Sequence, residues 1–211
     1  MENLNVNWSQ AWKKSLPILA LVGPILFFIA ALVRALGIGT LPGGLNWLSA
    51  PEGLLMSIGA PFFVATFIFL GQIISEQSPK TGILVTVLGV LGTAYLSFVS
   101  GFRGLAKGFV ESGLDPNLIQ SAFDSEAAVT WLSPLLLFHL GQLIAWIIAG
   151  VVIIRKKVAP LWVGLALILG VPFLLTAQAF YFNLEIFWPL ANGLWLLGVW
   201  GLGKFEKKIE I

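Results

Sequence analysis

The stretch LLLFHLGQLIAW (Leu135–Trp146) decides the fold, because it is apolar except at His139 and Gln142. It belongs to a longer apolar segment, Trp131–Ile154, which exceeds the roughly 20 residues that a transmembrane helix needs. His139 is the single histidine of the chain. An ionisable side chain inside a membrane span is costly, and it is by default a functional-site hypothesis. The stretch therefore predicts a membrane fold and marks where to search for a site.

The composition points to the same class of protein. Of the 211 residues, 58% are hydrophobic and 10% are charged, and the mean hydropathy is +0.94. Soluble domains carry about 25% charged residues, so a chain this poor in charge cannot cover a water-facing surface. We therefore expect an all-α integral membrane protein whose outer surface contacts the lipid bilayer.

Six apolar segments are long enough to cross a membrane as helices. No shift in composition divides them into separate domains, so we expect a single polytopic transmembrane domain over residues 1–211. The predicted spans are Leu16–Leu36, Leu54–Ser75, Gly82–Gly101, Trp131–Ile154, Pro160–Phe180 and Ile186–Leu202.

The distribution of basic residues predicts the orientation of these spans. If the N-terminus is inside, nine of the twelve Lys and Arg residues lie on the inner side, and cytoplasmic loops are enriched in such residues. Six spans then return the C-terminus to the inside as well. The inner residues are Lys13, Lys14, Lys80, Arg155, Lys156, Lys157, Lys204, Lys207 and Lys208, and the outer ones are Arg34, Arg103 and Lys107.

The longest outer segment connects the third and fourth spans over residues 102–130. Apolar residues recur at helical spacing from Phe102 to Val110, and Gly113 occupies the position of a C-capping glycine. Asp115 and Pro116 then form a helix-start signal. We expect two short amphipathic helices on the outer membrane surface, the first either separate from the third span or continuous with it, and the second running to about Val129. They could cap a cavity, contact a partner, or simply connect the spans.

Polar residues of the spans concentrate in the outer half of the membrane. His139 lies eight residues below Trp131, or about 12 Å at the helical rise, and Asn192 lies about 10 Å deep in the last span. We predict a ligand pocket lined by Arg34, Tyr95, His139, Gln142, Gln178 and Asn192. The alternative is structural. The Gln and Asn amides then hydrogen-bond between helices, and Arg34 extends to the outer lipid headgroups.

A short internal similarity links two of the spans. LGQII at Leu70–Ile74 resembles LGQLI at Leu140–Ile144, and Phe69 takes the place of His139 in the first copy. Duplication of a helical hairpin is one explanation, and chance matching in a chain rich in Leu, Ile and Gly is the other.

Several classes of function are disfavoured. The chain has no cysteine. One histidine without a carboxylate at the same depth provides too few donors for a metal site in the spans, so we expect no metal site and no cofactor. No GxSxG or HExxH motif is present. The net charge of +2 gives no reason to expect a nucleic-acid partner.

These observations favour a non-enzymatic integral membrane protein of a bacterial or archaeal plasma membrane. We expect it to bind a small hydrophobic or amphipathic molecule in the outer-half pocket, as a transport or uptake component. The alternative is an accessory or scaffold subunit that contacts partner membrane subunits within a larger complex. A membrane enzyme acting on lipid is a third hypothesis.

Overall fold

The structure, a computed structural model, describes residues 8–40, 49–123, 125–179 and 184–206. Lys207 and Lys208, which entered the orientation argument, lie outside these ranges. The described part of the chain is helical apart from its turns and one isolated bridge between Thr40 and Ser49. The helices are α1 (Trp8–Ala35), α2 (Ala50–Ser75), α3 (Pro79–Glu111), α4 (Pro116–Phe123), α5 (Glu126–Lys156), α6 (Leu161–Ala179) and α7 (Leu184–Glu206).

Within the described residues, all of these helices except α4 are long and apolar enough to cross a membrane. The prediction of six apolar spans is therefore confirmed, and the fold indicates a polytopic helical membrane protein. Several helices extend beyond the predicted spans. For example, α1 begins at Trp8 and α3 continues to Glu111. The predicted boundaries had followed hydropathy alone, whereas a helix continues until a breaker or a cap ends it.

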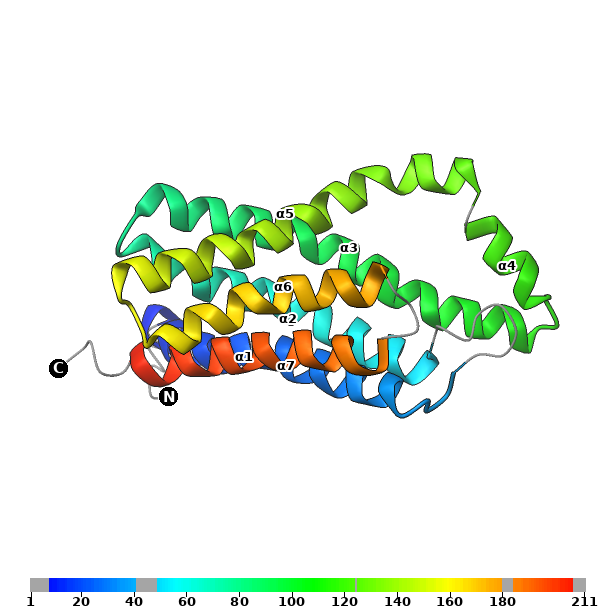
Figure 1. The fold of residues 1–211 in the computed structure, drawn as a ribbon, viewed down its shortest axis with the longest axis horizontal. Helices are drawn as coiled ribbons and strands as arrows, with labels where there is room; N and C mark the ends of the chain where they lie inside the picture. Colours follow the sequence, from blue (N-terminus) through cyan, green and yellow to red (C-terminus); the bar gives the residue numbers. More distant parts are fainter. Residues whose placement is uncertain (1–7, 41–48, 124, 180–183, 207–211) are drawn as a thin grey trace, which may run out of the picture.

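The contacts between the six long helices form a closed ring, and Figure 1 shows these helices lying alongside one another. Each helix contacts the next long helix along the chain, and α7 closes the ring against α1. Successive long helices run antiparallel, so the start of α1 and the end of α7 lie at the same end of the molecule. A few contacts between α2 and α5 cross the middle of the ring. This arrangement gives every long helix one face toward the interior and one toward the surroundings.

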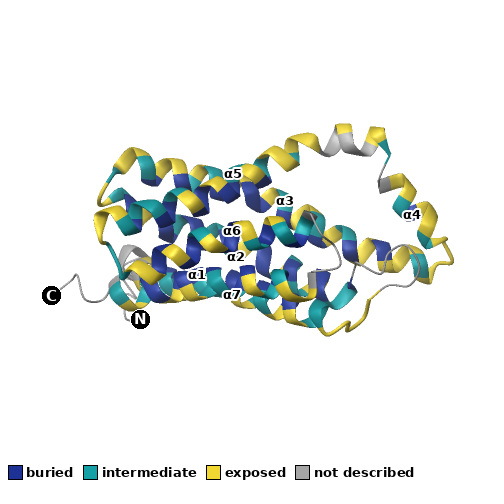
Figure 2. Cartoon of the chain, viewed as in Figure 1, coloured by how far each residue is buried: buried dark blue, intermediate teal, exposed yellow. Residues whose placement is uncertain are grey.

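The exposed residues lie on the outward faces of the helices (Figure 2), and many of them are large hydrophobic side chains, as lipid contact requires. Exposed large hydrophobic side chains occur on every long helix, and Ile18, Leu54, Ile83 and Leu161 are all more than half exposed. Buried residues, including the apolar core, face the inside of the ring. A helix that is hydrophobic on both its inner and outer faces is typical of a membrane span.

The outer segment differs in detail from the prediction. Residues 102–111 are the last turns of α3, so of the two predicted forms the first outer helix is the one continuous with the third span. No proline interrupts α3, so it continues until Gly113, whose φ of 89° closes it. α4 is shorter than predicted, and α5 already begins at Glu126. At about 1.5 Å per residue, the 33 residues of α3 exceed the roughly 30 Å hydrocarbon layer.

Candidate functional site

A cavity of about 460 Å³ lies inside the ring, near the end where α1 finishes and α2 begins. All six long helices contribute side chains to its wall. The structure thus brings the six residues predicted from the sequence around one cavity. The lining consists of Phe27, Arg34, Glu52, Met56, Phe63, Tyr95, Leu96, Val99, Arg103, Leu136, His139, Leu140, Gln142, Leu174, Gln178, Trp188, Asn192 and Trp195.

The cavity wall changes character along the helix axes. Its charged residues are Arg34 near the end of α1, Glu52 in the first turn of α2, and Arg103 in α3. Tyr95 precedes Arg103 by eight residues on α3, so its backbone lies about 12 Å further into the ring. Phe63 lies eleven residues beyond Glu52 on α2, about 16 Å deeper. The wall therefore passes from charged, through neutral polar, to aromatic.

The charged level is built around a buried ion pair. Arg103 Nη1 lies 2.6 Å from Glu52 Oε1, and the side chains are 9% and 2% exposed. The same nitrogen donates to Met56 Sδ at 2.8 Å, which places the guanidinium one turn inward along α2. The Arg103 guanidinium also lies 6.0 Å from the centroid of the Trp188 ring, a distance at which a cation is attracted to an aromatic face. The pair therefore connects α2, α3 and α7.

Local sequence explains why this ion pair can form. Ser49 caps α2 by accepting the backbone N–H of Glu52 at 3.4 Å, which fixes Glu52 in the first turn. Gly53 follows, and a Cβ at that position would lie 2.5 Å from Cβ of Arg103 and 3.1 Å from the carbonyl oxygen of Ser100. Glycine at this position therefore permits the close approach of α2 to α3 that brings the two charges together.

The neutral polar level is centred on His139. Its ring stacks on Tyr95 with centroids 4.4 Å apart and an interplanar angle of 25°. Its Nε2 lies 3.2 Å from Nε2 of Gln178, which joins α5 to α6. An amide nitrogen only donates, so this hydrogen bond requires His139 Nε2 to accept it. In that tautomer the ring proton is on Nδ1, which lines the cavity without a partner among the described residues.

Gln142 and Asn192 complete this polar level. Both are buried, and both line the cavity. Gly92 of α3 faces the Gln142 side chain so closely that an added Cβ would overlap its Cβ. Asn192 Nδ2 donates to the carbonyl oxygen of Trp188 one turn earlier on α7, at 2.9 Å. The hydrogen bond holds the Asn192 amide against its own helix.

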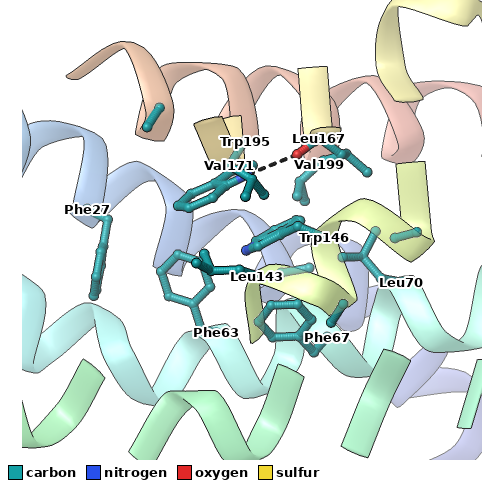
Figure 3. Packing of buried hydrophobic residues seen from close by; sticks show 14 of the residues in the cluster. Phe27, Phe63, Phe67, Leu70, Leu143, Trp146, Leu167, Val171, Trp195 and Val199 are labelled. Atoms are coloured by element: carbon teal, nitrogen blue, oxygen red, sulfur yellow. Dashed lines mark hydrogen bonds between the residues drawn. The ribbon is translucent and has the colours of Figure 1, made fainter. Parts of the chain in front are cut away.

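A cluster of buried aromatic side chains lies at the deep end of the cavity, and Figure 3 shows how its rings pack. The Trp146 and Trp195 rings stack with centroids 5.1 Å apart, and Phe67 lies 4.8 Å from Trp146 on the other side. Phe27 packs edge-on against Phe63 at 4.7 Å. Trp195 Nε1 donates to the carbonyl oxygen of Leu167 at 3.1 Å, the dashed line in Figure 3. These rings fill the centre of the ring of helices. Phe27, Phe63 and Trp195 line the floor of the cavity, and Phe67 and Trp146 pack against Phe63.

Polar atoms without a protein partner gather at this cavity. Among the described residues, five buried side-chain nitrogen or oxygen atoms have no hydrogen-bond partner. Four of them belong to residues of the cavity wall: Glu52 Oε2, Arg103 Nε, His139 Nδ1 and Trp188 Nε1. Buried polar groups are otherwise paired in native proteins, and unpaired ones call for an explanation. Most of the buried polar side-chain atoms that lack a partner in the described part of the chain therefore belong to the cavity wall.

Sequence reasoning missed the buried ion pair. From the sequence, Glu52 only marks the outer start of a helix, and Arg103 lies on the polar face of the predicted helix that follows the third span. The structure buries both, with exposed fractions of 1% and 8%. A signal was present in the sequence: SAPEG places the glutamate in a first turn after a capping serine. The closeness of the two residues depends on helix packing, which that signal does not contain.

No family model matches this chain, and the comparisons with curated proteins and with solved structures find no match either. The class of the protein therefore rests on its own features. It is a polytopic helical membrane protein with a cavity that lies among six apolar helices and is lined by both polar and apolar side chains.

Proposed function

We propose that the chain binds a small amphipathic molecule with an anionic group in this cavity, as a transport or uptake component that does not catalyse a reaction. The N- and C-termini lie inside, as the basic residues indicate, and the cavity then lies in the outer half of the membrane. The observation that carries the proposal is one cavity that combines buried charges, neutral polar groups and an aromatic floor. Its volume of about 460 Å³ falls in the range of about 300–1,000 Å³ typical of small-molecule sites.

The composition of the wall supports an amphipathic ligand with a negative charge. Two arginines and one glutamate give the described lining a formal charge of +1. The remaining wall is mainly aliphatic and aromatic, which suits an alkyl chain. Ligand sites commonly pair such an apolar surface with a few polar groups that fix orientation. A wholly polar solute would leave the apolar wall without a partner, and a pure hydrocarbon would leave the charges without one.

Two leucines of α5 support access from the outer lipid leaflet. Leu136 and Leu140 both line the cavity, and they are 42% and 49% exposed. They thus form a thin wall between the cavity and the lipid-facing surface. α5 also diverges from α6 toward its N-terminal end (Figure 1). A membrane-dissolved ligand would reach the cavity across this wall.

A second candidate function is supported by the outer arch, defined as the end of α3, α4 and the start of α5, which extends beyond the other helices (Figure 1). Ile119 and Ala106 form a small apolar cluster within it. Several of its other apolar side chains are exposed, namely Leu105, Phe109, Leu114 and Leu118. Such a surface suits an accessory subunit that contacts a partner protein.

Native mass spectrometry after purification in a mild detergent separates these functions. A binder carries a small amphiphile that is lost when Asn192, a residue of the cavity wall, is replaced by leucine. An accessory subunit co-purifies with a partner at fixed stoichiometry, and Leu118→Glu on the arch releases that partner. Protein that carries no small molecule, or that retains it in Asn192→Leu, argues against the binding function.

A further inference from the structure

The unpartnered atoms at the charged level have a specific chemical pattern. Arg103 Nε and Trp188 Nε1 are donors, and Glu52 Oε2 is an acceptor, and none has a partner among the described residues. All three side chains are at least nine-tenths buried. They lie together, because Arg103 contacts Glu52 at 2.6 Å and its guanidinium faces the Trp188 ring. This end of the cavity therefore offers two N–H groups and one carboxylate oxygen to a ligand.

A ligand that satisfies these atoms needs groups of both kinds. An anionic oxygen accepts from Arg103 Nε and Trp188 Nε1, and such charge-assisted hydrogen bonds are stronger than neutral ones. An N–H or O–H group of the same headgroup donates to Glu52 Oε2. A headgroup with oxygen atoms alone leaves the carboxylate oxygen unpaired in the buried site, and it also faces that negative charge. A fully methylated ammonium headgroup has no hydrogen atom to donate.

We infer that this end of the cavity selects an amphiphile whose headgroup combines an anionic oxygen with an N–H or O–H donor, of the phosphoethanolamine kind. The inference rests on the proposed binding function and adds the chemistry of the headgroup. The anionic oxygen lies against Arg103 and Trp188, and the donor lies against Glu52. The alkyl chain runs past Leu96 and Met56 toward the aromatic floor at Phe63.

The ion pair also has a purely structural explanation, namely that it ties α2 to α3. That role is complete with the 2.6 Å contact through Oε1 and Nη1. It leaves Glu52 Oε2 and Arg103 Nε without a hydrogen-bond partner, and it does not involve the indole N–H of Trp188. A structural role also predicts no difference between headgroups, which gives the two explanations different outcomes in a binding measurement.

The test compares two amphiphiles that differ only in methylation of the nitrogen. Dodecylphosphoethanolamine and dodecylphosphocholine share the chain and the phosphate, but only the first donates N–H. Their affinities for the full chain in nanodiscs are measured by isothermal titration, with empty nanodiscs subtracted. We expect the ethanolamine compound to bind at least tenfold more tightly. Equal affinity overturns the headgroup inference and leaves the binding function standing, whereas binding of neither compound overturns both.

Two variants test whether the preference for the ethanolamine compound depends on the Glu52 carboxylate. Glu52→Gln removes the acidic oxygen but keeps an oxygen for Arg103, and it should reduce the difference between the compounds to less than twofold. Glu185→Gln is the control, because Glu185 is an exposed glutamate in the first turn of α7 and does not line the cavity. A preference that survives Glu52→Gln contradicts the inference. If Glu52→Gln does not fold, the comparison in the unaltered chain still decides.

Phosphoethanolamine without a chain provides the last arm. We expect it to bind at least a hundredfold more weakly than the dodecyl compound, because it leaves the apolar wall unfilled. Equal affinity of the two would show that the ligand is a small water-soluble zwitterion, and the amphiphile inference would be wrong.

Discussion

Arg103 of α3 and Glu52 of α2 form a 2.6 Å ion pair inside the ring of helices, where neither side chain is more than 9% exposed. Taking two charges away from water is costly, and the cost is offset only while both partners are present. Single and double substitutions of the pair should therefore change the free energy of unfolding differently. Removing one partner leaves a buried charge alone, whereas removing both leaves a wholly apolar contact.

The first prediction concerns this ion pair. Arg103→Leu should lower the free energy of unfolding by about 3–5 kcal/mol, because it leaves the Glu52 carboxylate buried without its partner. Glu52→Leu together with Arg103→Leu should recover most of that loss. Reversible unfolding in mixed micelles gives the three free energies. Additive losses in the double variant would contradict the account of the pair.

An exposed pair on the same helix provides the control. Lys107 and Glu111 are separated by 3.6 Å, and their side chains are 49% and 67% exposed. Solvent screens such a pair, so Lys107→Leu should change the unfolding free energy by less than about 1 kcal/mol. A large effect there would show that the method responds to any charge removed from α3.

The second prediction concerns the approach of α3 to α5. Gly92→Ala places a methyl group where the Gln142 side chain lies, so either Gln142 or the helix must move, at a cost of about 1–3 kcal/mol. Gly104→Ala on the same helix meets no atom within 4 Å, and it should be neutral or stabilising because alanine favours helix. Equal effects of the two substitutions, measured as unfolding temperatures, would contradict the packing described at Gln142.

The third prediction concerns the aromatic floor. Trp146→Leu should destabilise the protein by about 2–4 kcal/mol, because the lost indole leaves a void at the centre of the ring. Trp200→Leu is the matched control, since Trp200 is 45% exposed and Trp146 is fully buried. Thermal unfolding of the two variants compares them directly. Similar losses would contradict the central position of Trp146.

The fourth prediction concerns the route into the cavity. Leu136→Trp should thicken the wall between the cavity and the lipid, and it should slow association of an amphiphile at least fivefold. Leu137→Trp one position along is the control, because Leu137 is 67% exposed and does not line the cavity. Stopped-flow fluorescence measures both rates. An unchanged association rate in Leu136→Trp would exclude entry beside α5.

Much of the fold was predictable because it depends on one-dimensional properties. Hydropathy over a window of about 20 residues identifies spans, and all six were located correctly. Depth along a helix follows from the rise per residue. That relation placed His139 and Asn192 at similar levels, and the structure finds both in the cavity wall. The rotation of each helix about its own axis was harder to predict from the sequence, because hydrophobic residues occupy both faces of a membrane helix.

The buried ion pair between Glu52 and Arg103 was not predictable for this reason. Arg103 follows an apolar segment and is flanked by Phe102 and Gly104, a pattern that also fits a surface helix. Its burial depends on Glu52, which is 51 positions away in the sequence, and on Gly53, which lets α2 approach. The aromatic floor is likewise a product of packing, because Trp146 meets Phe67 and Trp195 from two other helices.

The central claim is that the cavity is a binding site, and ligand affinity tests it most directly. The dissociation constant of the amphiphile that co-purifies with the protein is measured for the unaltered chain, His139→Phe, Asn192→Leu and Gln72→Leu. Gln72 belongs to the similar LGQ motif of α2 and does not line this cavity. We predict at least tenfold weaker binding for His139→Phe and for Asn192→Leu, and unchanged binding for Gln72→Leu, with all unfolding temperatures preserved. Unchanged affinity in both cavity variants would contradict the account.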